Sequence, residues 1–138
     1  MKNKAFTAVE MFMVIVIIAI LMGIFIPKFK GMQDDVKIAQ AKSEINTLQA
    51  AVESYKNNNS GVLPTKLDEL LSAHPKIVTS IVSDPFQTSG SWYSYQMGGS
   101  KYYVIFSVGP DRVPATSING SGVVTTSGDD ICVTNGKL

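Results

Sequence analysis

A single glutamate, Glu10, lies inside an otherwise apolar stretch that runs from residue 5 to residue 26, where the only other polar residue is Thr7. A carboxylate in the hydrocarbon core of a membrane costs at least a few kcal/mol, so such a residue is itself a functional hypothesis. Two interpretations are open for Glu10. Either it lies close enough to the membrane surface to stay hydrated, or it pairs with a cationic group of a neighbouring chain.

Other residues that could do chemistry are few. His74 is the only histidine, and no serine or cysteine nucleophile pattern accompanies it. Cys132 is the only cysteine, which excludes an internal disulfide and a cysteine-based zinc site, and we expect it to be a small apolar residue in a strand. The formal net charge is +1 and the basic residues are not clustered, so nucleic-acid binding is not expected. These observations predict a protein that is not an enzyme.

The apolar stretch predicts a membrane-spanning helix. A helix of about 22 residues is roughly 33 Å long, enough to cross the hydrocarbon core of a bilayer. A secretory signal peptide is the alternative, because Lys2 and Lys4 precede the stretch. The stretch is longer than a usual signal core, however, and no small-residue cleavage pattern follows it. Basic residues on the two sides balance, and we expect the carboxyl-terminal part to be exported.

The residues MKNKAFTAVEMFMVIVIIAILMGIFIP resemble the leader and amino-terminal helix of type IV pilins and type II secretion pseudopilins. The resemblance implies that prepilin peptidase removes residues 1–5 by cutting between Ala5 and Phe6, and methylates the new amino terminus at Phe6. Glu10 matches the family's glutamate that docks subunits in the filament, and Pro27 matches its helix-interrupting proline. One position departs from the family pattern, because Ala5 stands where the family usually has glycine. Residues 6–27 are then the transmembrane and filament-core helix.

A second helical segment is expected over residues 28–58. Apolar residues recur at intervals of three and four from Phe29 to Val36 and again from Ala41 to Tyr55, which predicts one apolar stripe along this segment. The stripe packs on the protein's own sheet or forms a coiled-coil seam. The charged residues on the other side are a solvated face, or they select the register between stacked subunits. The polar run from Asn57 to Gly61 predicts the end of the helix.

Residues 59–138 are expected to form a globular α+β domain. VLPTKLDELLSAHP predicts a linker and a short helix. SWYSYQMGGSKYYVIFSVGPD predicts an aromatic-rich β-hairpin that turns at Gly98-Gly99, with a sheet face laid on a helix. The remainder is rich in Ser, Thr and Gly, with short strands around 123–125 and 131–134. The domain is therefore expected to place an antiparallel sheet against the exported half of the long helix.

The order DPF, YSY, VIFSVGPD and DDI resembles the major pseudopilins of type II secretion. This resemblance implies a type IV pilin-like fold with a calcium-binding carboxyl-terminal loop. Its implied ligands are the carboxylates of Asp111, Asp129 and Asp130 and the main-chain carbonyl of Val108. Calcium takes about six to eight hard oxygen ligands, which this set suits. The alternative is that the three aspartates only stabilise turns.

The combined resemblance implies a filament-forming structural subunit. It would be a single-pass inner-membrane precursor with a periplasmic carboxyl-terminal domain. An inner-membrane assembly platform and minor pseudopilins would assist its polymerisation into a pseudopilus that drives protein export. One alternative is a type IV pilus subunit that forms an extracellular fibre for adhesion, motility or DNA uptake. Those pilins generally close the last loop with a disulfide, which one cysteine cannot form. A second alternative is a single-span membrane-anchored binding domain.

Overall fold

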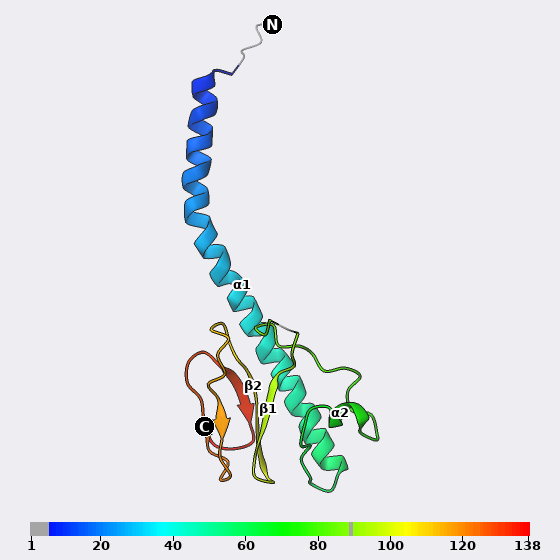
Figure 1. Ribbon diagram of the computed structural model, residues 1–138. Coiled ribbons are helices and arrows are strands. Elements are labelled where there is room, and N and C mark those ends of the chain that lie inside the picture. Colours follow the sequence, from blue (N-terminus) through cyan, green and yellow to red (C-terminus); the bar gives the residue numbers. More distant parts are fainter. Residues whose placement is uncertain (1–5, 89) are drawn as a thin grey trace. The chain divides into compact units, whose positions relative to one another are not determined.

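The computed structural model describes residues 6–88 and 90–138, apart from the side chains of residues 27 and 30. The chain divides into two units, Met1–Asp35 and Val36–Leu138. The longest element is helix α1 (Ala8–Asn58), whose amino-terminal part belongs to the first unit. The second unit holds the rest of α1, the short helix α2 (Glu69–Ser72) and the β-strands (Figure 1).

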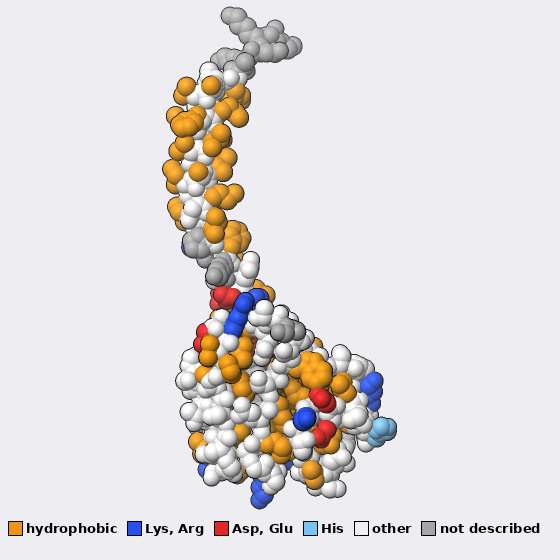
Figure 2. All heavy atoms as spheres, viewed as in Figure 1, with side chains coloured by type: hydrophobic (Ala, Val, Ile, Leu, Met, Phe, Trp, Pro, Cys, Tyr) orange, Lys and Arg blue, Asp and Glu red, His pale blue; other side chains and the backbone are white. Residues whose placement is uncertain are grey.

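The first unit exposes its apolar side chains. Val9, Phe12 and Ile26 are 70%, 69% and 66% exposed, and hydrophobic side chains line the visible surface of this part of the helix (Figure 2). Within the described residues, α1 is the one helix long and apolar enough to cross a membrane, judged by length and composition. A helix that is apolar on all sides requires lipid or other helices around it.

Helix α1 continues through residue 27, although proline removes one main-chain donor from a helix. Pro27 therefore does not end the helix, and its predicted role as a break in the secondary structure is wrong for the single chain. A bend of the helix axis at this residue stays a prediction.

The predicted apolar stripe along α1 is exposed in its first part and buried in its second. Phe29, Met32 and Val36 are exposed. The next members of the stripe are buried in the main core of the second unit: Ala41, Ile45, Leu48 and Val52. Helix α1 ends at Asn58, within the predicted end, and Gly61 follows with a positive φ of 86°. The buried half of the stripe thus packs inside its own domain, as one of the two interpretations expected.

An antiparallel sheet has the strand order β1 (Ser94–Gly98), β2 (Tyr102–Ser107), β5 (Ile131–Thr134). The predicted hairpin is confirmed, because β1 pairs with β2 up to Gly98 opposite Tyr102. Strand β5 has the predicted bounds. A second, two-stranded sheet pairs β3 (Ser117–Ile118) with β4 (Val124–Thr125). The α+β pilin-like fold, with a long helix packed on a small antiparallel sheet, is confirmed; its calcium loop stays a prediction.

Strand β2 is buried on both faces. Tyr103 and Ile105 point into the core that includes α1, whereas Val104 and Phe106 pack with Val124 of β4 in a second cluster. The sequence predicted only the face laid on the helix. The second face is covered because the segment after β2 folds back as the β3–β4 pair. Both ends of β2 are consequently fixed from two sides, including the end that leads toward the predicted calcium loop.

Candidate functional site

Glu10 lies in the first turn of α1 and forms a capping box with Thr7. Its Oε2 accepts hydrogen bonds from the main-chain nitrogen of Thr7 at 2.9 Å and from Thr7 Oγ1 at 2.8 Å. In return, the main-chain nitrogen of Glu10 donates to Thr7 Oγ1 at 3.3 Å. This reciprocal arrangement stabilises the start of a helix. The sequence interpretation missed this role, although a threonine followed three residues later by glutamate is its usual signature.

The capping box uses only one oxygen of Glu10. All of its side-chain hydrogen bonds within the described part of the chain involve Oε2, and no described basic side chain forms an ion pair with it. The side chain is exposed, so Oε1 remains available to a donor from outside the chain. The predicted cleavage site lies just before this turn. Phe6 is exposed, while Ala5 and the rest of the predicted leader, residues 1–5, lie outside the described residues.

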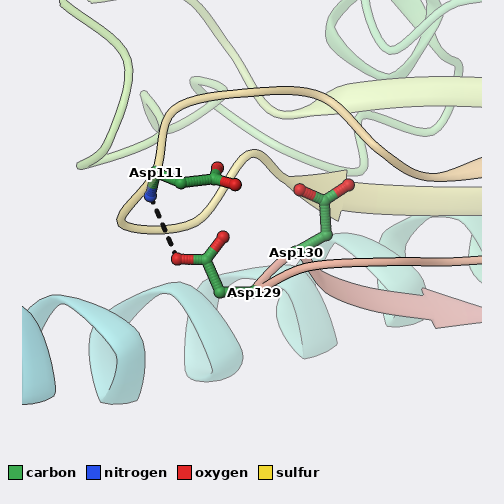
Figure 3. Close-up of side chains that lie close together, drawn as sticks. All are labelled: Asp111, Asp129 and Asp130. Atoms are coloured by element: carbon green, nitrogen blue, oxygen red, sulfur yellow. Dashed lines mark hydrogen bonds between the residues drawn. The ribbon is translucent and has the colours of Figure 1, made fainter.

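Three aspartates come together in the second unit. Asp111 lies in the turn after β2, and Asp129 and Asp130 directly precede β5. Because β2 and β5 are neighbours in the sheet, the two segments meet. One carboxylate oxygen of each residue lies within 4.8 Å of the others, and the carboxylates point toward a common space (Figure 3). The structure therefore brings together the three side chains named as calcium ligands.

Each of these carboxylates uses one oxygen to hold the loop. Asp129 Oδ2 accepts from the main-chain nitrogen of Asp111 at 3.0 Å. Asp111 Oδ1 accepts from Val113 at 2.8 Å, and Asp130 Oδ2 accepts from Ala115 at 2.9 Å. The turn-stabilising role considered from the sequence is thus present. It occupies only one oxygen of each carboxylate, so the two roles are compatible.

The second oxygen of Asp130 is the unusual one. Asp130 Oδ1 is buried and has no hydrogen-bond partner among the described residues. Leaving a buried polar atom without a partner costs about 1–3 kcal/mol, and more when the group is charged. No described basic side chain forms an ion pair with any of the three aspartates. Uncompensated carboxylates in contact repel each other, and a bound cation would neutralise them. The donor set therefore fits a hard divalent cation such as calcium.

A glycine allows the two acidic segments to approach. Gly109 has a φ of 67°, in the region that favours glycine. A Cβ at this position would collide with the main-chain carbonyl oxygen of Asp129 and lie 2.8 Å from its Oδ1. Val108, just before it, is buried and donates its main-chain nitrogen to Asp84 Oδ2 at 3.2 Å. The role of the Val108 carbonyl as a ligand stays a prediction.

Comparison with known proteins finds curated relatives that share one name. No family model matches the chain, and no solved structure does. Curated relatives match most of it. The chain is 29% identical over 130 residues to the type II secretion system core protein G of Klebsiella pneumoniae, which covers 84% of this chain and 91% of that protein. The chain is similar to the core protein G major pseudopilins of type II secretion. The core protein G of Pseudomonas aeruginosa is 26% identical over 136 residues, covering 88% of this chain and 94% of that protein.

The core protein G of Pectobacterium carotovorum subsp. carotovorum gives the same result, with 27% identity over 131 residues, 83% of this chain and 81% of that protein. These matches confirm the major-pseudopilin resemblance stated from the sequence motifs. The type IV pilus subunit and the single-span binding domain are not favoured, because the matched proteins share one name and one secretion system. Each match covers more than four-fifths of this chain, so the similarity is not confined to the amino-terminal apolar segment.

Proposed function

We propose that this pseudopilin polymerises through the amino-terminal part of α1 into a periplasmic pseudopilus that drives protein export. The exposed apolar surface of residues 6–26 supports this proposal most strongly. Such a surface is stable only when it is kept from water. Inner-membrane lipid would surround it before assembly, and the same segment of neighbouring subunits would pack against it in the filament. The subunit would be structural and without catalytic activity, with its carboxyl-terminal domain in the periplasm. Its partners would be prepilin peptidase, the inner-membrane assembly platform and minor pseudopilins.

Glu10 would dock each subunit into the filament. A carboxylate among packed apolar helices is costly alone and far less costly when paired. The cationic partner would be the amino group of Phe6 in a neighbouring, processed subunit. Because the cap with Thr7 uses Oε2 alone, Glu10 can keep its cap and still accept that amino group through Oε1.

Two variants separate docking from capping. Glu10→Gln keeps a side chain that can serve in a capping box but removes the charge. We expect normal membrane insertion and at least a tenfold loss of sedimentable filament in cells that carry the secretion system. Thr7→Ala removes the two capping hydrogen bonds that use the threonine hydroxyl and keeps the charge, so assembly is expected to continue. If the Glu10→Gln protein assembles normally, Glu10 is only a capping residue, and the docking role fails.

The processing proposal has its own measurement. Mass spectrometry of the mature amino terminus is expected to find a methylated Phe6. Ala5→Gly, which restores the family's usual residue before the cut, serves as the control and is expected to give the same terminus. A chain that keeps residues 1–5 in both proteins contradicts processing at this site.

We also propose that calcium binds between Asp111, Asp129 and Asp130, with the Val108 carbonyl as a further ligand. The buried, unpartnered Oδ1 of Asp130 supports this site. Bound calcium would supply positive charge that neutralises the three carboxylates and links the two ends of the loop. The test is thermal unfolding of the full chain in detergent, with calcium, with magnesium and with chelator. A ligand at one hundred times its Kd stabilises by about 2.7 kcal/mol, which is a shift of several degrees in Tm. Equal Tm values in calcium and chelator would leave the aspartates as turn residues only.

A further inference from the structure

We infer that Asp84 is a positioning residue for the acidic site, acting through the end of β2 without touching the ion. This inference rests on the proposed calcium site. Asp84 lies in the segment between α2 and β1 and is 2% exposed. It is distant in sequence from all of the proposed ligands, and no described basic side chain forms an ion pair with it.

The carboxylate of Asp84 holds consecutive residues where β2 ends. Its Oδ1 accepts from Ser107 Oγ at 2.8 Å, and from the main-chain nitrogen of Phe86 at 3.0 Å. Its Oδ2 accepts from the main-chain nitrogen of Val108 at 3.2 Å. Ser107 Oγ in turn accepts from the main-chain nitrogen of Gly109 at 3.4 Å. One buried side chain therefore fixes Ser107 and Val108 directly, and Gly109 through the serine hydroxyl.

These residues lead straight into the acidic loop. Gly109 lies against the main chain of Asp129, and its carbonyl accepts from the main-chain nitrogen of Arg112 at 3.1 Å. Asp111, between them, donates its main-chain nitrogen to Asp129 Oδ2 at 3.0 Å. A shift of Val108 and Gly109 would consequently move Asp111 away from Asp129. It would also move the Val108 carbonyl, so Asp84 sets the position of two proposed ligands at once.

The position requires a carboxylate and not merely a polar side chain. Both oxygens of Asp84 act as acceptors, and an ionised carboxylate can only accept. Asparagine has one acceptor oxygen and one donor group. In Asp84→Asn, either Val108 or the Ser107–Phe86 pair of donors would therefore face an NH₂ group. The substitution keeps the shape of the side chain and removes half of its acceptor function.

The test compares calcium affinities of full-length proteins in detergent by isothermal titration calorimetry. Asp84→Asn is expected to raise the Kd for calcium at least tenfold, and Ser107→Ala is expected to raise it by a smaller factor. The matched control is Val52→Ala, which truncates a fully buried core side chain on α1 and lowers stability but leaves every hydrogen bond of Asp84 in place. Its Kd is expected to stay within a factor of three of the wild-type value. Circular dichroism identifies the variants that fold, and Ser107→Ala decides the question if Asp84→Asn does not.

A second readout needs no calcium. In chelator, the main-chain amides of Asp111 and Val113 are expected to exchange faster in Asp84→Asn and Ser107→Ala than in Val52→Ala of similar stability. The positioning role is overturned if Asp84→Asn and Ser107→Ala bind calcium as tightly as the wild type, or if Val52→Ala loses as much calcium affinity as they do. The calcium site stands in both cases. A wild-type protein that does not bind calcium overturns the calcium site, and this inference with it.

Discussion

Replacing Gly109 with alanine tests whether the turn after β2 sets the distance between Asp111 and Asp129. The matched control is Gly61→Ala, just after α1. Both glycines have positive φ, 67° and 86°, so both alanine variants carry the strain of a left-handed conformation, roughly 1–2 kcal/mol. They differ in their surroundings, because a Cβ at Gly61 meets nothing within 4 Å, whereas one at Gly109 collides with the main chain of Asp129.

The collision at Gly109 lowers the unfolding free energy beyond the loss that the backbone strain causes. To relieve it, Gly109 and Asp129 must separate, which breaks the hydrogen bond from the main-chain nitrogen of Asp111 to Asp129 Oδ2. A hydrogen bond to a charged acceptor contributes about 1.5–3 kcal/mol. We therefore expect Gly109→Ala to lose roughly 2 kcal/mol more unfolding free energy than Gly61→Ala.

Urea unfolding of the full chain in detergent micelles, in chelator, measures this difference. Trp92 is the only tryptophan and lies in the second unit, so its fluorescence follows the unfolding of that unit. Unfolding free energies are comparable when the denaturant slopes of the two variants agree. A difference below about 0.5 kcal/mol, which is within the error of such extrapolations, would refute the reasoning. The contact between Gly109 and Asp129 would then be adaptable, and the turn would not set the geometry of the acidic site.

Phe106→Ala is expected to lower the unfolding free energy by about 3–5 kcal/mol, because this 1% exposed ring fills the second face of β2. The control is Val123→Ala, an exposed position next to β4, which is expected to lower it by less than about 1 kcal/mol. Equal losses in the two variants would contradict the burial of β2 on both faces. Burial raises the pKa of Tyr93 and Tyr103, so their stabilising contribution is complete below the ordinary tyrosine value of about 10 and is lost as the pH rises through the folded value. The urea midpoint should therefore be level from pH 7 to 9 and fall above pH 10, and a midpoint that stays constant to pH 11 speaks against it. Hydrogen bonds from Thr65 lower the pKa of Glu69, so the stability that Glu69 contributes is present above about pH 4.5 and is lost on acidification. In Glu69→Gln the urea midpoint should therefore fall less as the pH is lowered. An acid dependence equal to that of the wild type would exclude this contribution.

Regular periodicity made most of the fold predictable. The apolar repeat along α1 and the alternation in β1 and β2 are strong signals, and the bounds of β5 followed from a short apolar run. Strand β3 was missed, because two residues carry no period. Missing it also hid the burial of Val104 and Phe106. The sequence predicted the long helix, and only the break expected at Pro27 is absent from it. A proline weakens a helix locally without necessarily ending it, and hydrogen bonds on either side can hold it.

The candidate site was only partly predictable. Asp111, Asp129 and Asp130 were named because their motifs resemble those of a family, and sequence spacing alone would have left them as turn residues. The contacts of Asp84 reach residues more than twenty positions away, and no local pattern signals such a bond. The capping role of Glu10 was different, since the spacing from Thr7 was readable and the apolar surroundings drew the interpretation elsewhere.

The position of β2 between β1 and β5 also predicts an order of folding. Only residues 99–101 separate β1 from β2, whereas β5 joins β2 across residues 108–130. The entropic cost of closing the second loop is greater by roughly 2 kcal/mol. The hairpin should therefore form early and β5 should join it late, so the acidic loop closes after the rate-limiting step. A cation bound there would then slow unfolding of the subunit and leave its folding rate almost unchanged.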